Sequence, residues 1–154
     1  MGGSALRKIT SFCIIIILLL AIGCSNNDGI KHNYTYKGEN NFWTAEYKVN
    51  GTDAFTKKGS KNSSESRSNA TFTITYRKNL AELSSIKHME ISYESSVHRQ
   101  KITNNYNKNN RLNKKTYILK SDSKGSAIEG KDEIIKASIN LDGKIQTIDL
   151  KSIQ

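Results

Sequence analysis

The stretch Ala70-Thr71-Phe72-Thr73-Ile74-Thr75-Tyr76 decides the fold class of this 154-residue chain. Apolar and aromatic side chains alternate strictly with threonines, and successive side chains of a strand point to opposite faces of a sheet. One face of the segment is therefore aliphatic and aromatic, while the other is β-branched and polar. The segment predicts a β-strand with one face in the core and the other toward solvent.

The same two-residue period occurs upstream. Its apolar positions are Trp43, Ala45, Tyr47 and Val49. Asn50-Gly51 follows directly and predicts a hairpin turn, because these two residues tolerate the positive φ of a type I′ turn. We therefore expect a return strand over residues 52–57. The next residues, 58–69, contain no apolar residue and predict a mobile polar loop.

Downstream, residues 79–86 carry the only helical spacing, with Asn79 placed to cap a single turn. Alternation then resumes at Met89, Ile91 and Tyr93. The remaining segments of this region predict, in order, an edge strand over 97–102, a loop over 104–113, a short strand over 116–120 and a turn over 121–125.

The C-terminal segment predicts a hairpin with a defined register. A two-residue turn at Asp142-Gly143 gives the pairs Leu141–Lys144, Ile139–Gln146, Ala137–Ile148 and Ile135–Leu150. The apolar members of these pairs then share one face, so the pairing and the hydrophobic pattern agree. Ile145 is left on the outer face.

Seven or eight short strands separated by turn signals predict an all-β fold. We expect an antiparallel β-sandwich, loosely immunoglobulin-like, over residues 38–154. A small closed barrel is the alternative. The aromatic side chains expected in its core are Trp43, Tyr47, Phe72, Tyr76 and Tyr93.

The N-terminus has the composition of an export signal. Arg7 and Lys8 precede the 13 charge-free residues 11–23, which rise only about 20 Å as a helix, against about 30 Å for a bilayer core. The stretch from Ala21 to Cys24 resembles the lipobox of bacterial lipoproteins, whose cysteine receives diacylglycerol on its sulfur. We therefore expect a signal peptide over 1–23, a lipidated flexible tether over 24–37, and a domain on the extracytoplasmic face of the cell membrane.

An uncleaved signal anchor is the alternative interpretation of this segment. With lipidation, Cys13 leaves with the signal and Cys24 is occupied, so no thiol remains for a disulfide, a metal site or catalysis. The two acyl chains of a diacylglyceryl group are sufficient for stable anchoring.

The mature chain would carry 22 basic and 14 acidic residues, a net charge of +8. This charge favours polyanions such as teichoic acid or anionic lipid headgroups. It also fits a composition rich in Lys, Asn and Ile, since the bases are scattered along the sequence and not gathered in one run. Nucleic acid is not expected as a partner at the cell surface.

No constellation of catalytic or metal-binding residues is recognisable. His32, His88 and His98 lack metal-site spacing and are expected at the surface, and neither GxSxG nor SxxK occurs. We predict no catalytic residue, no metal and no cofactor.

From Gly38-Glu39-Asn40-Asn41-Phe42-Trp43 onward, the chain resembles a group of small uncharacterised lipoproteins of low-GC Gram-positive bacteria. Tyr47-Lys48-Val49, Leu83-Ser84-Ser85-Ile86 and the final Asp142-Gly143-Lys144 turn are also similar to that group. The resemblance implies a lipidated surface protein with a β domain. It implies no activity and no catalytic residue.

Three functional hypotheses follow. The first is a membrane-anchored, non-enzymatic module that binds a partner at the surface, such as a cell-surface protein, or has a structural role. The second is an electrostatic binder of anionic cell-wall polymer or lipid headgroups. The third is a hydrolase whose site the sequence does not reveal.

Overall fold

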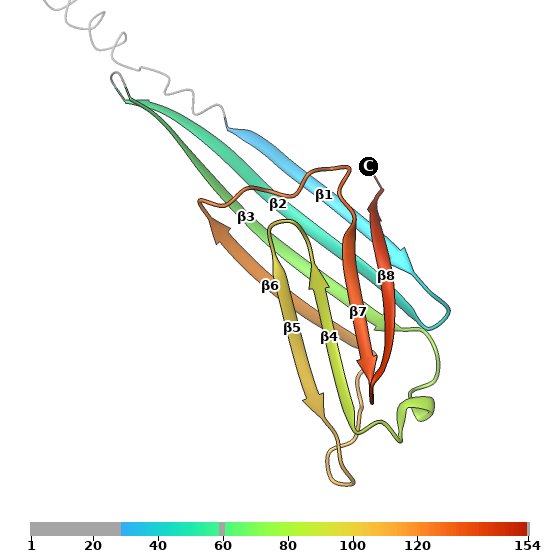
Figure 1. The fold of residues 1–154 in the computed structure, drawn as a ribbon. Coiled ribbons are helices and arrows are strands. Elements are labelled where there is room, and N and C mark those ends of the chain that lie inside the picture. Colours follow the sequence, from blue (N-terminus) through green and yellow to red (C-terminus); the bar gives the residue numbers. More distant parts are fainter. Residues whose placement is uncertain (1–28, 59–60, 154) are drawn as a thin grey trace, which may run out of the picture.

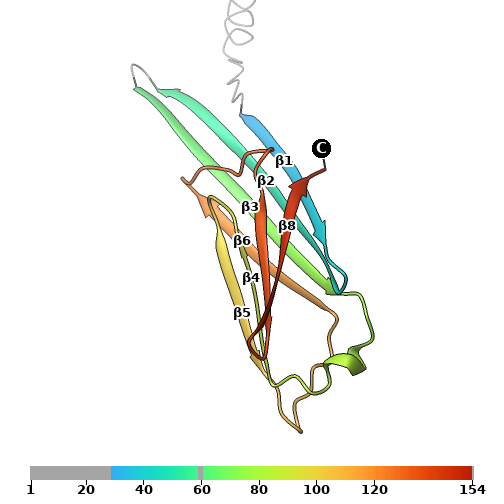
Figure 2. The same cartoon turned by 45° about the vertical axis from the view of Figure 1, so that its right-hand side comes forward.

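The structure, a computed structural model, describes residues 29–58 and 61–153 and is all-β (Figures 1 and 2). Its strands are β1 (Ile30–Glu39), β2 (Trp43–Lys58), β3 (Lys61–Tyr76), β4 (His88–Glu94), β5 (Arg99–Asn105), β6 (Thr116–Lys124), β7 (Ile135–Leu141) and β8 (Lys144–Ser152). A short 3₁₀ turn, η1 (Leu80–Leu83), lies between β3 and β4. All strand pairs are antiparallel, which confirms the predicted class.

The eight strands form one continuous sheet in the order β5-β4-β7-β8-β1-β2-β3-β6. The sheet curls so that β1–β2–β3–β6 face β5–β4–β7–β8, with only two residue pairs joining β1 to β8. The two edge strands also meet, because Gln100 Nε2 donates to the Lys120 carbonyl oxygen at 2.8 Å. The result is nearly barrel-shaped, whereas we expected the two separate sheets of a sandwich.

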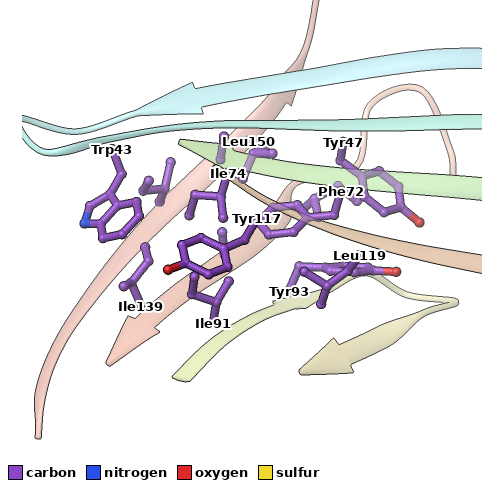
Figure 3. Close-up of a cluster of buried hydrophobic side chains, with 14 of the residues drawn as sticks. Trp43, Tyr47, Phe72, Ile74, Ile91, Tyr93, Tyr117, Leu119, Ile139 and Leu150 are labelled. Atoms are coloured by element: carbon purple, nitrogen blue, oxygen red, sulfur yellow. The ribbon is translucent and has the colours of Figure 1, made fainter. Parts of the chain in front are cut away.

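The core lies between the facing layers (Figure 3). The ring of Tyr47 lies 5.1 Å from that of Tyr93, and Phe72, which pairs with Tyr47 across β2 and β3, lies 5.0 Å from Tyr93. Trp43 packs on Tyr76 at 5.0 Å. All five aromatic residues predicted for the core are buried, so the two-residue period identified the inner face correctly.

The C-terminal hairpin has the register predicted from its sequence. Leu141 pairs with Lys144 and Ile135 with Leu150. Asp142 and Gly143 have positive φ values of 49° and 88°, as the tight turn requires. Ile145 is on the outer face and 66% exposed.

The predicted tether over 24–37 is wrong for its second half. Residues 30–39 form β1, which pairs with β2 along its whole length, from Ile30–Asp53 to Glu39–Thr44. Tyr36 is completely buried. The other part of that prediction, including Cys24, lies outside the described residues.

The predicted turn at Asn50-Gly51 is also wrong. β2 continues through both residues, and Asn50 pairs with Asn33 on one side and Asn69 on the other. A Cβ at position 51 would lie 2.5 Å from Ile128 Cδ1, so a larger residue there would require the Ile128 side chain to move. Because β2 runs on, β3 begins at Lys61 and replaces most of the loop predicted over 58–69.

The smaller elements agree better with the predictions from the sequence. Asn79 caps η1, accepting a hydrogen bond from the Ala81 amide at 3.0 Å. β5 is an edge strand, as expected, although it begins and ends later than predicted. β6 extends to Lys124, so the turn predicted over 121–125 starts only at its last residue.

Candidate functional site

Four connections meet at the end of the sheet opposite Ile30, which we call the distal end (Figure 1). They are the β1–β2 turn, residues 77–87 between β3 and β4, residues 106–115 between β5 and β6, and the β7–β8 turn. Their bases are Arg77, Lys78, Lys87, Lys108, Arg111, Lys114 and Lys115, and their acids are Glu82 and Asp142, a net charge of +5.

The described connections at the opposite end have the opposite charge. Residues 95–98 are uncharged apart from a histidine, and residues 125–134 contain one lysine and three acids, a net charge of −2. Among the described connections, the bases therefore lie mainly at the distal end. The charge asymmetry is a property of the topology and could not be read from composition.

A depression of about 360 Å³ lies at the distal end, between the two long connections. Its charged lining residues are Lys87, Lys108 and Arg111, and no acid lines it. Ser84, Ser85 and Asn107 add hydroxyl and amide groups. We call this depression the basic pocket.

Hydrogen bonds hold the walls of the basic pocket in place. The Tyr106 amide donates to the Lys87 carbonyl oxygen at 2.7 Å, which ties the two connections together. The Asn107 side chain accepts from the amides of Asn109 and Asn110, each at 2.9 Å. Because the backbone is fixed in this way, the basic side chains project from defined positions.

The Asp142 carboxylate fixes the beginning of β4. It accepts from the Lys87 amide at 3.1 and 3.2 Å and from the His88 amide at 2.7 Å. The turn residue therefore positions Lys87 through the backbone and does not pair with its ammonium group.

The bases of the pocket are available for a ligand. Lys87, Lys108 and Arg111 are exposed, and within the described part of the chain no ion pair involves them. A guanidinium and two ammonium groups around one depression, with hydroxyl and amide donors, suit phosphate or carboxylate oxygens.

A second cluster of polar groups is buried at the other end. Glu129 is 1% exposed, and its Oε1 accepts from Tyr47 Oη at 2.5 Å, Ser95 Oγ at 2.8 Å and His98 Nδ1 at 2.9 Å. Residues 125–134, which we call the strap, cross this end of the sheet. The Tyr36 hydroxyl also binds the strap, donating to the Gly130 carbonyl oxygen at 2.7 Å.

The surroundings of Glu129 favour its charged, carboxylate form. Burial alone would raise the pKa of Glu129, but hydrogen bonds from Tyr47, His98 and Ser95 stabilise the charged form and bring its pKa below the usual value. The pKa of Tyr47 is raised, first by burial and then by the hydrogen bond to Glu129. Tyr47 therefore remains a hydrogen-bond donor at neutral pH.

The cluster does not have the arrangement of a nucleophilic site. In a catalytic relay the histidine accepts a proton from the nucleophile, whereas His98 and Ser95 both donate to the same carboxylate oxygen. Ser95 Oγ accepts from the backbone amides of Val97 and His98, which is the geometry of a turn. The cluster ties the strap to the β4–β5 connection.

All three histidines were predicted to lie at the surface, and the structure corrects this prediction for one of them. His98 was expected at the surface, but its side chain is only 11% exposed because it packs against Glu129. His32 binds Asp53 at 2.9 Å, and His88 binds Asn105 at 2.8 Å, both at partly exposed positions. No group of metal-binding residues occurs among the described residues.

Sequence reasoning missed Glu129, because it is one of three acids in the polar run 129–133 and nothing in the pattern distinguishes it as buried. Among the described residues, no helix has the length and hydropathy to cross a bilayer. The predicted lipidation residue, Cys24, is not among them. No family model, curated protein or solved structure matches the chain.

Proposed function

We propose that this chain is a membrane-anchored extracytoplasmic lipoprotein, lipidated at Cys24, whose β domain binds an anionic surface polymer through the basic pocket. Its role is binding and not catalysis. The observation that carries the proposal is the concentration of unpaired bases around the pocket at the distal end. A polymer of glycerol phosphate or uronic acid presents the regularly spaced anions that such a surface attracts.

The direction of β1 supports this arrangement. The tether enters the sheet at Ile30, and β1 runs ten residues to Glu39, about 33 Å, before the chain reaches the distal end. With the lipid on Cys24, the basic pocket faces away from the membrane and toward the cell-wall space. The connections at residues 95–98 and 125–134 then lie on the side of the bilayer.

Binding of a glycerol phosphate polymer to the full-length lipidated protein, held in neutral phosphatidylcholine vesicles, tests the proposal. Removing both bases in K108A/R111A should weaken binding about 30-fold, since each base near an anionic surface contributes about 1 kcal/mol. Binding should also weaken steeply with salt, because the bases are exposed.

The control is K136A/K151A, which removes two exposed bases outside the pocket and changes the net charge by the same amount. We expect this variant to bind nearly as well as the parent. Equal losses in both double variants would contradict a localised site, and salt-insensitive or absent binding would contradict the proposal.

The anchor is tested separately. Cys24→Ser should abolish incorporation of labelled fatty acid and release the protein from the membrane. Unchanged membrane fractionation of this variant would instead support the signal anchor.

A further inference from the structure

β2 and β3 extend beyond both of their neighbours. β1 begins at Ile30, opposite Asp53, and β6 ends at Lys124, opposite Arg67. Residues 54–58 and 61–66 therefore form a two-stranded projection, which we call the arm (Figures 1 and 2). The arm points in the direction from which the chain enters β1.

The base of the arm exposes apolar side chains. Phe55 and Ile30 are each 55% exposed. Phe55 continues the register of Tyr47 and Val49, the inner face of β2, past the point where the opposite layer covers it. A single exposed apolar residue is unremarkable, but Phe55 and Ile30 lie near one another, since Ile30 pairs with Asp53, and together they expose apolar surface that can enter a membrane interface.

Basic residues accompany this apolar pair. Lys31, Arg67 and Lys124 lie together at the same level of the outer face, where β1, β2, β3 and β6 run side by side. Glu65 pairs with Arg67 at 3.3 Å and with Lys124 at 2.9 Å. Farther out, the sequence of the arm contains three lysines, and Glu65 is its one acid. This net charge of +2 suits an anionic surface.

The length of the tether decides whether the arm can reach the bilayer. Five residues lie between Cys24 and Ile30, and a flexible chain of that length has an r.m.s. span of about 12 Å. The arm continues five residues beyond Asp53, the partner of Ile30, and five residues of strand span about 17 Å. The arm is therefore longer than the typical reach of the tether.

We propose that the arm is a second membrane contact, in which Phe55 enters the headgroup region and the neighbouring bases lie against anionic lipid phosphates. This inference rests on the proposed lipid anchor at Cys24. The anchor keeps the arm at high effective concentration near the surface, so a contact that is weak alone becomes populated. The contact orients the domain and holds the distal end outward.

The experiment uses full-length lipidated protein in vesicles of phosphatidylglycerol with brominated acyl chains, which quench tryptophan only at close approach. F55W should lose most of its added fluorescence, and the loss should be smaller in phosphatidylcholine vesicles. F42W is the matched control, since Phe42 is 42% exposed at the distal end. It lies 13 residues from Phe55, about 43 Å along the strand, and should not be quenched.

The buried Trp43 is present in every sample, and the parent protein supplies its background. F55W that floats with the vesicles but is quenched no more than F42W would overturn the inference and leave the anchor intact. Equal quenching of F55W in neutral and anionic vesicles would overturn the assignment to anionic lipid. Parent protein that does not float with vesicles would overturn the anchor and the inference with it.

Discussion

Glu129 should be the most sensitive polar residue of the domain, because one buried carboxylate oxygen satisfies three donors. Glu129→Ala leaves the Tyr47 hydroxyl, the Ser95 hydroxyl and His98 Nδ1 without this acceptor. Charge-assisted hydrogen bonds contribute about 1.5–3 kcal/mol each but are not additive within one network. We expect a loss of about 3–5 kcal/mol in the free energy of unfolding, a large share of the 5–15 kcal/mol typical of a domain.

The contribution of Glu129 to stability should depend on pH in a defined direction. The folded-state pKa of Glu129 lies below its ordinary value of 4.5, because the hydrogen bonds outweigh burial. Its stabilising contribution is therefore complete above the ordinary pKa and is lost as the pH falls through the folded-state pKa. Glu129→Gln keeps the shape of the side chain and removes this titration, so its stability should fall less than that of the parent below pH 4.5.

Urea denaturation of the parent and both variants, at several pH values between 7 and 3, measures these effects. Glu94→Gln is the control, since Glu94 pairs with Arg99 at the exposed surface and should contribute less than about 1 kcal/mol. The reasoning is refuted if Glu129→Ala unfolds within 1 kcal/mol of the parent with an unchanged m value, or if Glu129→Gln and the parent lose stability equally in acid.

Three further substitutions test other parts of the fold by the same denaturation assay. Gly38→Ala should cost about 1–3 kcal/mol, because its Cβ would lie 2.5 Å from the Asp149 carbonyl oxygen and force β8 away from β1; a neutral result would mean that this junction is loose. Asp142→Ala should cost about 1–2 kcal/mol, since it removes the acceptor of the Lys87 and His88 amides and places alanine at a φ of 49°, whereas Asp142→Asn should recover most of this loss. Ile145→Thr should change stability by less than about 0.5 kcal/mol, and a larger loss would indicate a covered outer face.

The two-residue period was sufficient to predict most of the sheet. At the C-terminal hairpin the turn residues and the apolar pattern agree, so the register was fixed down to individual pairs. Trp43, Tyr47 and Phe72 were assigned to the inner face for the same reason, and all are buried. Where the turn residues and the apolar pattern indicate the same pairing, the strand register can be predicted from the sequence alone.

The predictions from sequence are wrong where local residue preferences and long-range pairing conflict. Asn50-Gly51 has the composition of a turn, but pairing with both β1 and β3 outweighs that preference, and Ile128 packs closely over Gly51. β1 was missed because its outward residues are polar and its inward residues are tyrosine and histidine, which resemble a solvated tether. The burial of Glu129 depends on contacts from three separate segments, none of them adjacent in sequence.

The basic charge shows why composition and topology must be considered together. The sheet is antiparallel throughout, so the connections after β1, β3, β5 and β7 all lie at the distal end. Bases in residues 77–87 and 106–115 are separated in sequence and become neighbours only through this alternation. The described connections at the two ends differ by seven charges, from +5 to −2, although the strands themselves carry further bases at the end that contains Ile30. The position of the charge, and not its amount, is therefore the feature that a ligand would recognise.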